Sequence, residues 1–595
     1  MTQKGKRSTG TRILPFLVLA VAIVVALALF APTLSYGFLE WDDRLNILEN
    51  PAVTGESLLP AWTSPWFGLY NPVVQTFWRV VYALGVGSPA PFRVLNLLLH
   101  VVNGLLVFAL SVRILRDRDA NGEGDNSLVF SQAAVAATIF LLHPLQVGAV
   151  AWISGSRDLI ATALALLAVL LLAALLLQPI SARTRASLLA TSAAATLCFA
   201  ASMLAKPSAA AVPAVLLVLA ATPLGSGYVA RKRALIVAGA WSAVVVIIAA
   251  VTYSVQADLT PMEIPIPQRL LGAIDAIGFY VMKVIAPSGL TVDYGRTPAA
   301  VWSGELVPSR TLAVTIGVLS LGALGFAMMR WRTARRTTLL LGIAGTLLLP
   351  VLGLIPFSFQ RISTVADHYM YLPMAFVGMA VGSLLGARPR GRAMPQWTFA
   401  VVCAAIVLVA FAVTPSRVAV WESDHALFVD ALSKNPRSVP ALISVAKDAC
   451  DAGSLEEGIA YAERAVALDA TKGSAYSNLA HCLFKAGQPE RVNALMPVLT
   501  ANAPVIHDLE RDNAPASSLL NSLAGSHFVT DRPLAGWLLL CNALALRPGN
   551  EMLQANLRDV APEVVKAGGS PVCEPTSGIA NLLKRVEQID HGGGT

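Results

Sequence analysis

The sequence predicts an all-α protein in which a polytopic membrane helix bundle is followed by an α-solenoid of helical repeats. Three observations lead to this prediction. Of the 595 residues, 55% are hydrophobic and only 13% are charged, which is more apolar surface than a water-facing fold can bury. Apolar segments of membrane-spanning length alternate with short runs of Lys and Arg up to about residue 415. From Trp421 onward the composition is that of soluble helices, with a 34-residue period.

The net charge of +8 does not indicate a nucleic-acid partner. The Lys and Arg residues cluster between apolar segments, which is the distribution that sets the orientation of membrane proteins. No nucleic acid is therefore expected, and the lipid bilayer is the expected partner of the apolar segments.

The spans can be taken in order from the basic tail 1–12, which is expected to stay in the cytoplasm. The apolar segment 13–32 is predicted to be an uncleaved anchor that delivers the first extracytoplasmic loop, 33–88, to the outside. A further span begins at Pro207 and ends before Arg231. The other spans are predicted near 89–115, 131–147, 159–177, 187–205, 234–255, 311–329, 338–357, 371–385 and 397–413. Eleven spans in a domain of residues 13–415 place the C-terminal part outside.

Segment 268–286 is the exception among the apolar stretches. It carries Arg269, Asp275 and Lys283, which is more charge than a lipid-facing span tolerates. A span here would also leave the Arg-rich run after Met329 on the outer side. We therefore predict an in-plane or re-entrant outer helix.

The region 420–570 is predicted to be an extracytoplasmic domain of helical repeats. Ala446, Gly453 and Ala460 recur as Ala480, Gly487 and Ala494, one period later. The predicted units are 437–470 and 471–504, followed by a degenerate unit that ends at 543–548, since a stable solenoid needs about three repeats. A plain helical bundle is the alternative. Residues 571–595 are predicted to be a C-terminal tail, frayed at Gly592–Gly594.

Six cysteines are present. Cys198 and Cys403 lie in apolar spans and are expected to pack there. Cys450, Cys482, Cys541 and Cys573 lie in the C-terminal part without metal-ligand spacing, and their pairing cannot be deduced from the sequence.

Polar residues cluster on one predicted side of the membrane. Each cluster also has an ordinary structural explanation: Asp-Asp forms turns, His143 ends a helix, Arg157 and Asp158 form an ion pair at a helix end, and Lys206 extends to the interface. Together, a carboxylate pair and several cations at one water–membrane boundary would suit a phosphate-bearing lipid. The clusters are Asp42-Asp43, His143 with Arg157-Asp158, Lys206, Asp293-Tyr294, and Arg361 with Asp367-His368-Tyr369.

A set of motifs in a fixed order carries a resemblance to a known family. They are Trp41-Asp42-Asp43 with Asn50-Pro51, Asn96 with His100, Phe140–Pro144, Ala151–Asp158, Leu290–Tyr294 and Ala366–Pro373, followed by the repeats. With these motifs the chain resembles the transmembrane and tetratricopeptide-repeat-containing O-mannosyltransferases and their bacterial relatives, within the GT-C glycosyltransferase superfamily.

The resemblance implies transfer of a hexose from a polyprenyl-phosphate donor, the co-substrate, to an acceptor hydroxyl. Asp42 is assigned as the base that takes the hydroxyl proton, and Asp43 would orient Asp42 or raise its pKa. No metal or other cofactor is expected. The acceptor, expected to be Ser or Thr of an exported protein, would lie on the repeat surface 437–548. The donor and its phosphate are assigned to Arg157, Asp158, Lys206, Arg361, His368 and His143.

Four residues depart from the family pattern. Asn71 and His368 stand where we expect Arg, and Gly148 and Pro207 stand where we expect Glu. These departures are compatible with a different sugar or acceptor, with a pH-sensitive phosphate contact at His368, or with lost catalysis.

The sequence therefore predicts a multi-pass glycosyltransferase of the bacterial inner (plasma) membrane, with a cytoplasmic N-terminus. Two alternatives stay open: a membrane-anchored repeat scaffold whose transferase half is degenerate, and a transferase that acts on glycolipid or polysaccharide. A transporter fits less well, because the polar groups gather at one boundary and not at mid-membrane.

Overall fold

A computed structural model describes residues 10–85, 87–116, 126–176, 184–221, 228–256, 263–303, 305–306, 308–330, 335–386 and 396–590. Within these ranges the regular structure is helical, and the β-structure consists of one isolated bridge between Trp66 and Leu69. The predicted all-α class is confirmed. The chain forms two compact units, residues 1–427 and 428–595, and the predicted boundary lies near residue 415–420.

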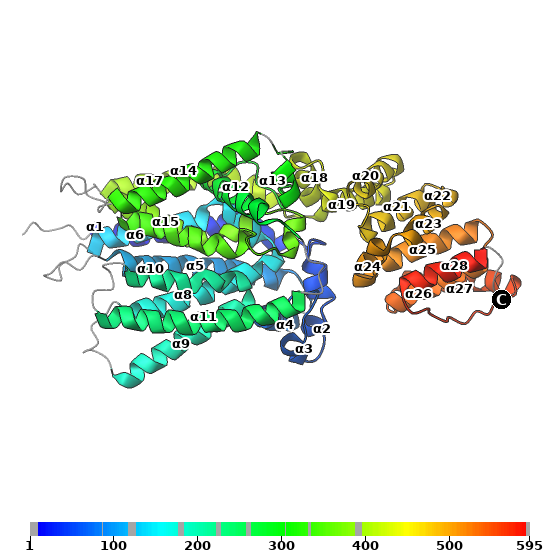
Figure 1. The fold of residues 1–595 in the computed structure, drawn as a ribbon, viewed down its shortest axis with the longest axis horizontal. Coiled ribbons are helices and arrows are strands. Elements are labelled where there is room, and N and C mark those ends of the chain that lie inside the picture. Colours follow the sequence, from blue (N-terminus) through cyan, green and yellow to red (C-terminus); the bar gives the residue numbers. More distant parts are fainter. Residues whose placement is uncertain are drawn as a thin grey trace, which may run out of the picture. The chain divides into compact units, whose positions relative to one another are not determined.

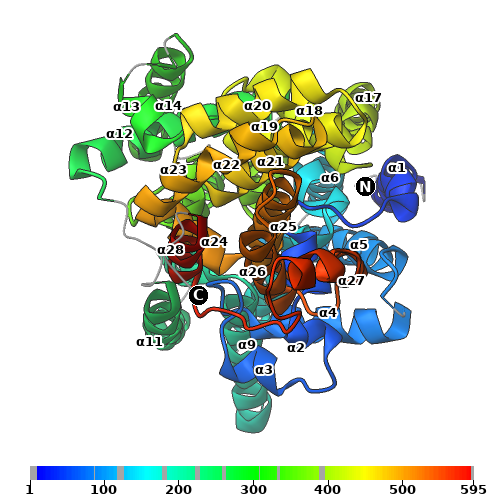
Figure 2. The same ribbon diagram turned by 90° about the vertical axis from the view of Figure 1, so that its right-hand side faces the viewer.

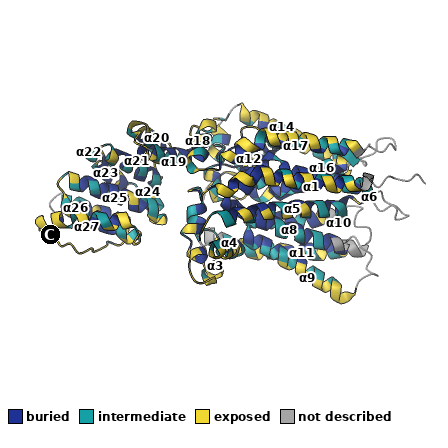
Figure 3. Ribbon diagram, turned by 180° about the vertical axis from the view of Figure 1, so that it is seen from behind, coloured by how far each residue is buried: buried dark blue, intermediate teal, exposed yellow. Residues whose placement is uncertain are grey.

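The first unit is a bundle of long helices that run side by side (Figure 1). At its centre α8 (Ser156–Leu176) packs against α5 (Ala90–Leu115), which packs against α6 (Asn126–Leu142). The span that contains α8 has 67% of its residues buried, whereas only 11% are buried in α14 (Ser309–Arg330). Exposed residues run along α14 and the other outer helices (Figure 3). Residues carried by the N-terminal end of α8 are therefore held in the interior of the unit.

Seven of the described helices are long and apolar enough to cross a membrane. They are α1 (Gly10–Phe30), α5, α8, α9 (Arg185–Ala205), α11 (Tyr228–Gln256), α14 and α17 (Gln396–Ala419). An eighth candidate is α6 with the following η3 (Pro144–Gln146) and α7 (Val147–Ala151), bent by 51°. The three other predicted spans hold shorter helices: η6 (Pro207–Ala211) with α10 (Val212–Ala221), α15 (Arg335–Leu348), and α16 (Pro373–Gly386). Prolines at 207, 350 and 373 limit their length.

Short helices connect the long ones at the end of the unit that carries the predicted site. The loop after α1 contains η1 (Ala31–Ser35) and η2 (Arg44–Leu48), and then α2 (Pro51–Thr54), α3 (Leu59–Thr63) and α4 (Pro72–Gly85), which lie together beside α9 (Figure 2). The connection between α15 and α16 contains η7 (Leu349–Val351), η8 (Ser358–Arg361) and η9 (Asp367–Met370).

The segment predicted as an in-plane helix forms α12 (Ile266–Ile285), and it is not among the seven spanning candidates. Its buried Asp275 forms an ion pair with Arg296, and the Arg296 Nε lies 3.0 Å from an Asp275 oxygen. The Arg296 carbonyl also accepts a hydrogen bond from the Thr364 amide at 2.7 Å. Charge within this helix is thus compensated, and α12 is fastened to the loop that leads to η9.

The second unit is built from helical hairpins. They are α19 (Val439–Asp451) with α20 (Leu455–Leu468), α21 (Gly473–Lys485) with α22 (Pro489–Asn493) and α23 (Leu495–Ala501), and α25 (Asn513–Val529) with α26 (Pro533–Leu546). Two further helices, α27 (Glu551–Lys566) and α28 (Ile579–Asp590), each pack on α26. Helix α24 (Ala503–Arg511) is inserted after the second hairpin, and α18 (Asp424–Lys434) crosses the boundary between the units.

The same turn follows the first helix of each hairpin and also follows α27. Gly453, Gly487, Asp531 and Gly568 each have a positive φ. In each turn that residue donates to the carbonyl three residues back, and the next residue donates to the carbonyl five back, as in a Schellman motif. The spacings are 34, 44 and 37 residues, so the inserted α24 and the Asp at position 531 hide the third and fourth turns from a search at one period.

The segment 571–595, predicted as a tail, differs from that prediction. Helix α28 occupies residues 579–590, and Ile579, Leu582, Leu583 and Val586 form a buried stripe at helical spacing within the core of the unit. This stripe is short and isolated in sequence, and it needs the helices that pack on it, α26 first and then α24 and α23, to bury it. The frayed end predicted at Gly592–Gly594 lies outside the described residues.

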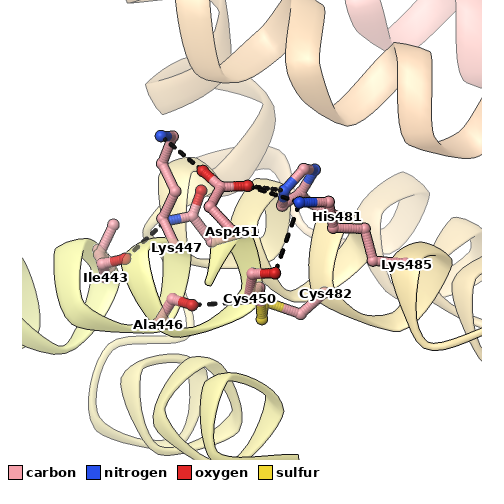
Figure 4. Close-up of a disulfide and its surroundings, with 9 residues drawn as sticks. Ile443, Ala446, Lys447, Cys450, Asp451, His481, Cys482 and Lys485 are labelled. Carbon is pink, nitrogen blue, oxygen red and sulfur yellow. Dashed lines mark hydrogen bonds and ion pairs between the residues drawn. A yellow bond between two sulfur atoms is a disulfide. The ribbon is translucent and has the colours of Figure 1, made fainter. Parts of the chain in front are cut away.

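Two disulfides link neighbouring parts of the second unit. Cys450 of α19 pairs with Cys482 of α21, and Cys541 of α26 pairs with Cys573. Figure 4 shows the first disulfide beside Asp451, which accepts hydrogen bonds from Lys447 (3.1 Å), His481 (3.0 Å) and Lys485 (2.8 Å). Cys198 and Cys403 are free thiols of the first unit.

Several basic groups used to predict the topology lie outside the described residues. They are most of the tail 1–12, the loop 117–125, Arg183, Arg332 and the cluster Arg388, Arg390 and Arg392. The orientation of the bundle in the membrane stays a prediction.

Candidate functional site

The two adjacent carboxylates Asp42 and Asp43 lie between η1 and η2 and point into different environments. Asp42 has a φ of 67°, in the left-handed region that few residues other than Gly adopt, although Asp tolerates it better than most. Its side chain is 47% exposed, whereas Asp43 is fully buried. The unusual backbone at Asp42 therefore separates the two neighbours.

Asp43 is held by three hydrogen-bond donors. The amide and the hydroxyl of Ser154 donate to one oxygen at 3.0 and 2.6 Å, and the Leu39 amide donates to the other at 3.2 Å. Burial raises the pKa of Asp43 from 3.8 to about 6, and hydrogen bonds from Ser154 and the charge of Arg93 oppose that rise. These contacts favour an orienting role for Asp43.

Asp42 faces Arg157, the second residue of α8. The Arg157 Nη2 lies 3.1 Å from the Asp42 Oδ2, and its Nε donates to the Ser154 carbonyl at 3.1 Å. The guanidinium also stacks over Trp152, 5.3 Å from the ring centroid. The ion pair of Arg157 therefore bridges 115 residues of sequence and does not involve its neighbour Asp158.

Asp158 instead pairs with Lys206, the residue that ends α9. The Lys206 Nζ lies 2.6 and 2.8 Å from the two carboxylate oxygens of Asp158, and both side chains are largely buried. The ammonium also lies over the ring of Tyr369, 5.6 Å from its centroid. Lys206 does not merely extend to the interface, because it closes a compensated pair inside the bundle.

His368 lies among aromatic rings beside these cations. Its ring centroid is 5.8 Å from that of Trp152 and 4.6 Å from that of Tyr369. Burial lowers the pKa of His368 well below 6.5, and the positive charges of Lys206 and Arg157 lower it further. In the free protein His368 is therefore neutral at physiological pH, which argues against the pH-sensitive contact considered for it.

Gly148, like His368 a departure from the family pattern, lies beside residues of the site. A Cβ added to Gly148 would lie 3.7 Å from Asp367 and 3.7 Å from the Trp421 ring, so those two side chains occupy the space that a longer residue would need. Trp421 stacks on Trp152, with centroids 6.1 Å apart. Asp367 accepts a hydrogen bond of 2.5 Å from the Tyr294 hydroxyl, which joins two of the predicted clusters.

The other two departures are local. Asn71 is buried and accepts a hydrogen bond of 2.8 Å from Gln75, one turn into α4. Pro207 occupies the first position of η6, where its missing amide costs nothing. Neither position carries a charge that a phosphate could use.

His143 and Arg361 differ from the other predicted donor residues. The Nε2 of His143 lies 3.0 Å from the Val284 carbonyl, and its Nδ1 accepts from the Leu145 amide at 3.3 Å. Both ring nitrogens are thus used by the backbone, which favours a structural role. Arg361 is exposed at the end of η8.

Sequence reasoning did not assign roles to several residues that hold the site together. Arg93 of α5 donates to the carbonyls of Tyr36, Gly37 and Ala151, and Asn96 donates to those of Val150 and Trp152, at 3.2 and 2.8 Å. Arg93 and Asn96 therefore hold two segments of the site in place: the loop after α1 and the segment that precedes α8. A charged residue inside an apolar span was the available signal for Arg93.

No three His, Cys, Asp or Glu side chains group as metal ligands within the described ranges. The expectation that no metal is needed stays an expectation. The groups at hand are one half-exposed carboxylate and two cations, which suit proton removal from a hydroxyl beside a phosphate.

Comparison with known proteins supports the resemblance over part of the chain. No protein-family model matches. The chain is 30% identical over 163 residues to a protein O-mannosyl-transferase of Drosophila melanogaster, covering 26% of this chain and 18% of that protein. It is 29% identical over 181 residues to a protein O-mannosyl-transferase of Caenorhabditis elegans, covering 28% of this chain and 24% of that protein. The matches thus span at most about a quarter of those relatives.

One solved structure is also similar, the apo oligosaccharyltransferase of Archaeoglobus fulgidus. It is 13% identical, with a TM-score of 0.39, and the alignment covers 76% of this chain and 60% of that chain.

Proposed function

We propose that the protein is a membrane glycosyltransferase that moves a hexose from a polyprenyl-phosphate donor to a hydroxyl acceptor, with Ser and Thr of exported proteins as the expected acceptors. The observation that carries the proposal is the Asp42–Arg157 pair beside the Asp158–Lys206 pair. It sets a half-exposed carboxylate next to two cations at one end of a membrane bundle. The sequence similarity to two O-mannosyl-transferases supports the same reaction class.

In the proposed reaction the acceptor oxygen attacks the anomeric carbon while the bond from that carbon to the phosphate oxygen breaks. Asp42 takes the hydroxyl proton as the new bond forms, a contribution of about 10²–10⁴-fold in rate for a well-placed base. Arg157 and Lys206 balance the charge that develops on the leaving phosphate. Trp152 and Tyr369 hold these two cations by stacking.

The site is proposed to face the outside of the bacterial inner (plasma) membrane. The repeat unit, whose surface 437–548 would hold the acceptor, is proposed to lie on that side too. Support comes from its two disulfides, since such bonds persist in oxidising extracytoplasmic compartments and are rare in the cytosol.

The proposal can be tested by glycopeptide mass spectrometry of envelope proteins from four strains: wild type, deletion, and the deletion complemented with Asp42→Asn or with Glu40→Gln. Glu40 is the matched control, because it is an exposed carboxylate of the same loop, paired with Arg44. We expect a hexose mass to disappear in the deletion and in Asp42→Asn and to persist in Glu40→Gln.

The other outcomes separate the alternatives. Full rescue by Asp42→Asn would make the carboxylate structural and support the scaffold reading. Loss of an envelope glycan without loss of any protein-linked hexose would identify a glycolipid or polysaccharide acceptor.

A further inference from the structure

Four residues of the site form a closed ring of contacts. Asp42 is bonded covalently to Asp43; Asp43 accepts two hydrogen bonds from Ser154; the Ser154 carbonyl accepts one from Arg157; and Arg157 pairs with Asp42. Ser154 is fully buried, and it is the one member of the ring that touches both Asp43 and Arg157 through its own polar atoms.

The ring explains how the backbone at Asp42 is kept in place. A positive φ at a non-glycine residue raises the conformational free energy by of order 1–3 kcal/mol, and it persists only when surrounding contacts hold the backbone there. The Asp43 clasp to Ser154 supplies that constraint on one side, and the hydrogen bond from the Trp152 indole to the Trp41 carbonyl, at 2.9 Å, supplies it on the other. Without the clasp, the direction in which Asp42 leaves the loop would depend on the Arg157 pair and the Trp41 side alone.

We propose that Ser154 is a positioning residue for the transfer reaction: by clasping Asp43 and the Arg157 side chain together, it sets the Asp42 carboxylate against Arg157. This inference rests on the proposed function. Ser154 touches no reacting atom, so it acts only through the two residues that it holds. Displacing a catalytic base by about 1 Å can lower the reaction rate by about 10²-fold, so a residue that holds the base in position can matter for catalysis.

The sequence offers a matched control two residues away. Ser156 is also buried, and its hydroxyl accepts a hydrogen bond of 2.7 Å from the Trp78 indole. It is the first residue of α8 and is outside the ring. Ser154→Ala and Ser156→Ala each remove one buried hydroxyl, and only the first should disturb Asp42.

The experiment uses the full-length chain in lipid nanodiscs, with polyprenyl-phosphate mannose as the donor, a peptide that contains Ser and Thr as the acceptor, and acceptor-dependent release of polyprenyl phosphate as the readout. The variants are Ser154→Ala, Ser156→Ala, Asp43→Asn, the double variant Ser154→Ala/Asp43→Asn, and Asp42→Asn. We expect Ser154→Ala to lower kcat by about 10- to 100-fold with the donor KM nearly unchanged, and Ser156→Ala to stay within about threefold of wild type.

Two further readouts separate positioning from general destabilisation. The double variant should be no slower than the slower single variant, because both changes open the same clasp. The acid limb of the kcat–pH profile should move to higher pH in Ser154→Ala and not in Ser156→Ala, since loss of the hydroxyl donor leaves the Asp43 carboxylate with less support for its charge. The charged group that also acts on Asp43 is Arg93 of α5.

The inference is overturned if Ser154→Ala and Ser156→Ala behave alike, or if the single effects of Ser154→Ala and Asp43→Asn add. The proposed function fails separately, and this inference with it, if Asp42→Asn turns over as fast as wild type or if wild type releases no polyprenyl phosphate.

Discussion

Lys206 contacts both carboxylate oxygens of Asp158, at 2.6 and 2.8 Å, across the interface between α9 and α8. The exposed fractions of the two side chains are 19% and 9%, so each charge depends on the other for compensation. An intact buried ion pair contributes little to the net free energy of folding. Removing only one of its two charges is strongly destabilising, because the other charge is left buried without a partner.

We expect Lys206→Met to destabilise the first unit by about 3 kcal/mol, because it leaves the Asp158 carboxylate buried without a partner. Thermal unfolding of the detergent-solubilised protein measures this. The double variant Lys206→Met/Asp158→Leu should recover part of the loss, since it removes both charges. Equal unfolding temperatures for wild type and Lys206→Met would contradict the pairing.

Asp43 should make the stability depend on pH between about 4 and 6. Its pKa is about 6 in the folded protein against 3.8 for a free side chain, so the folded state binds more protons in that window. The stabilisation is present below pH 4 and is lost as the pH rises through 6. A shift of two pH units corresponds to about 3 kcal/mol. Unfolding temperatures at several pH values measure the slope, which should flatten in Asp43→Asn but persist in Glu40→Gln.

His368 should not titrate between pH 6 and 8 in the free protein, because burial and its two cationic neighbours hold its pKa well below 6.5. We therefore expect His368→Gln to leave the shape of the kcat/KM–pH profile unchanged in that range, whatever it does to the absolute rate. A break near neutral pH that is present in wild type and absent in the variant would refute this assignment.

Thiol counting tests the disulfides and, with them, the proposed compartment. Chain isolated from cells, unfolded without reductant and treated with a maleimide should take up two labels, at Cys198 and Cys403, and six labels after reduction. Six labels before reduction would place the repeat unit in a reducing compartment. Peptide mapping of the labelled sites guards against disulfide exchange during preparation.

The architecture was largely readable from composition because membrane helices need long apolar runs, and each predicted span contains a helix. The repeats were readable while the period held. After Gly487 only the end of the degenerate third unit, at 543–548, was predicted, and α26 ends there at Leu546; the turn at 531 was not found, since α24 lengthens the interval and Asp531 replaces the expected Gly. Helix α28 was missed because its four-residue stripe is indistinguishable from a short amphipathic tail until α26, α24 and α23 cover it.

The sequence predicted most residues of the candidate site, but it did not predict which of them contact one another. Arg157 and Asp158 are adjacent in sequence, which suggests a local pair, yet successive residues of a helix start point in different directions. One of them reaches Asp42 and the other Lys206. The separation of Asp42 from Asp43 depends on a single backbone angle, which no residue pattern specifies. Four cysteines allow three pairings, and only spatial proximity chooses among them.

The positions of the two disulfides determine what happens when a protease cuts the repeat unit. The first joins one hairpin to the next and the second joins α26 to the segment that follows α27, each across 32 residues of chain. A protease that cuts once between Cys450 and Cys482, or once between Cys541 and Cys573, cannot release a fragment, because both pieces stay joined by the disulfide. A repeat unit cut in either place can therefore remain one covalent body.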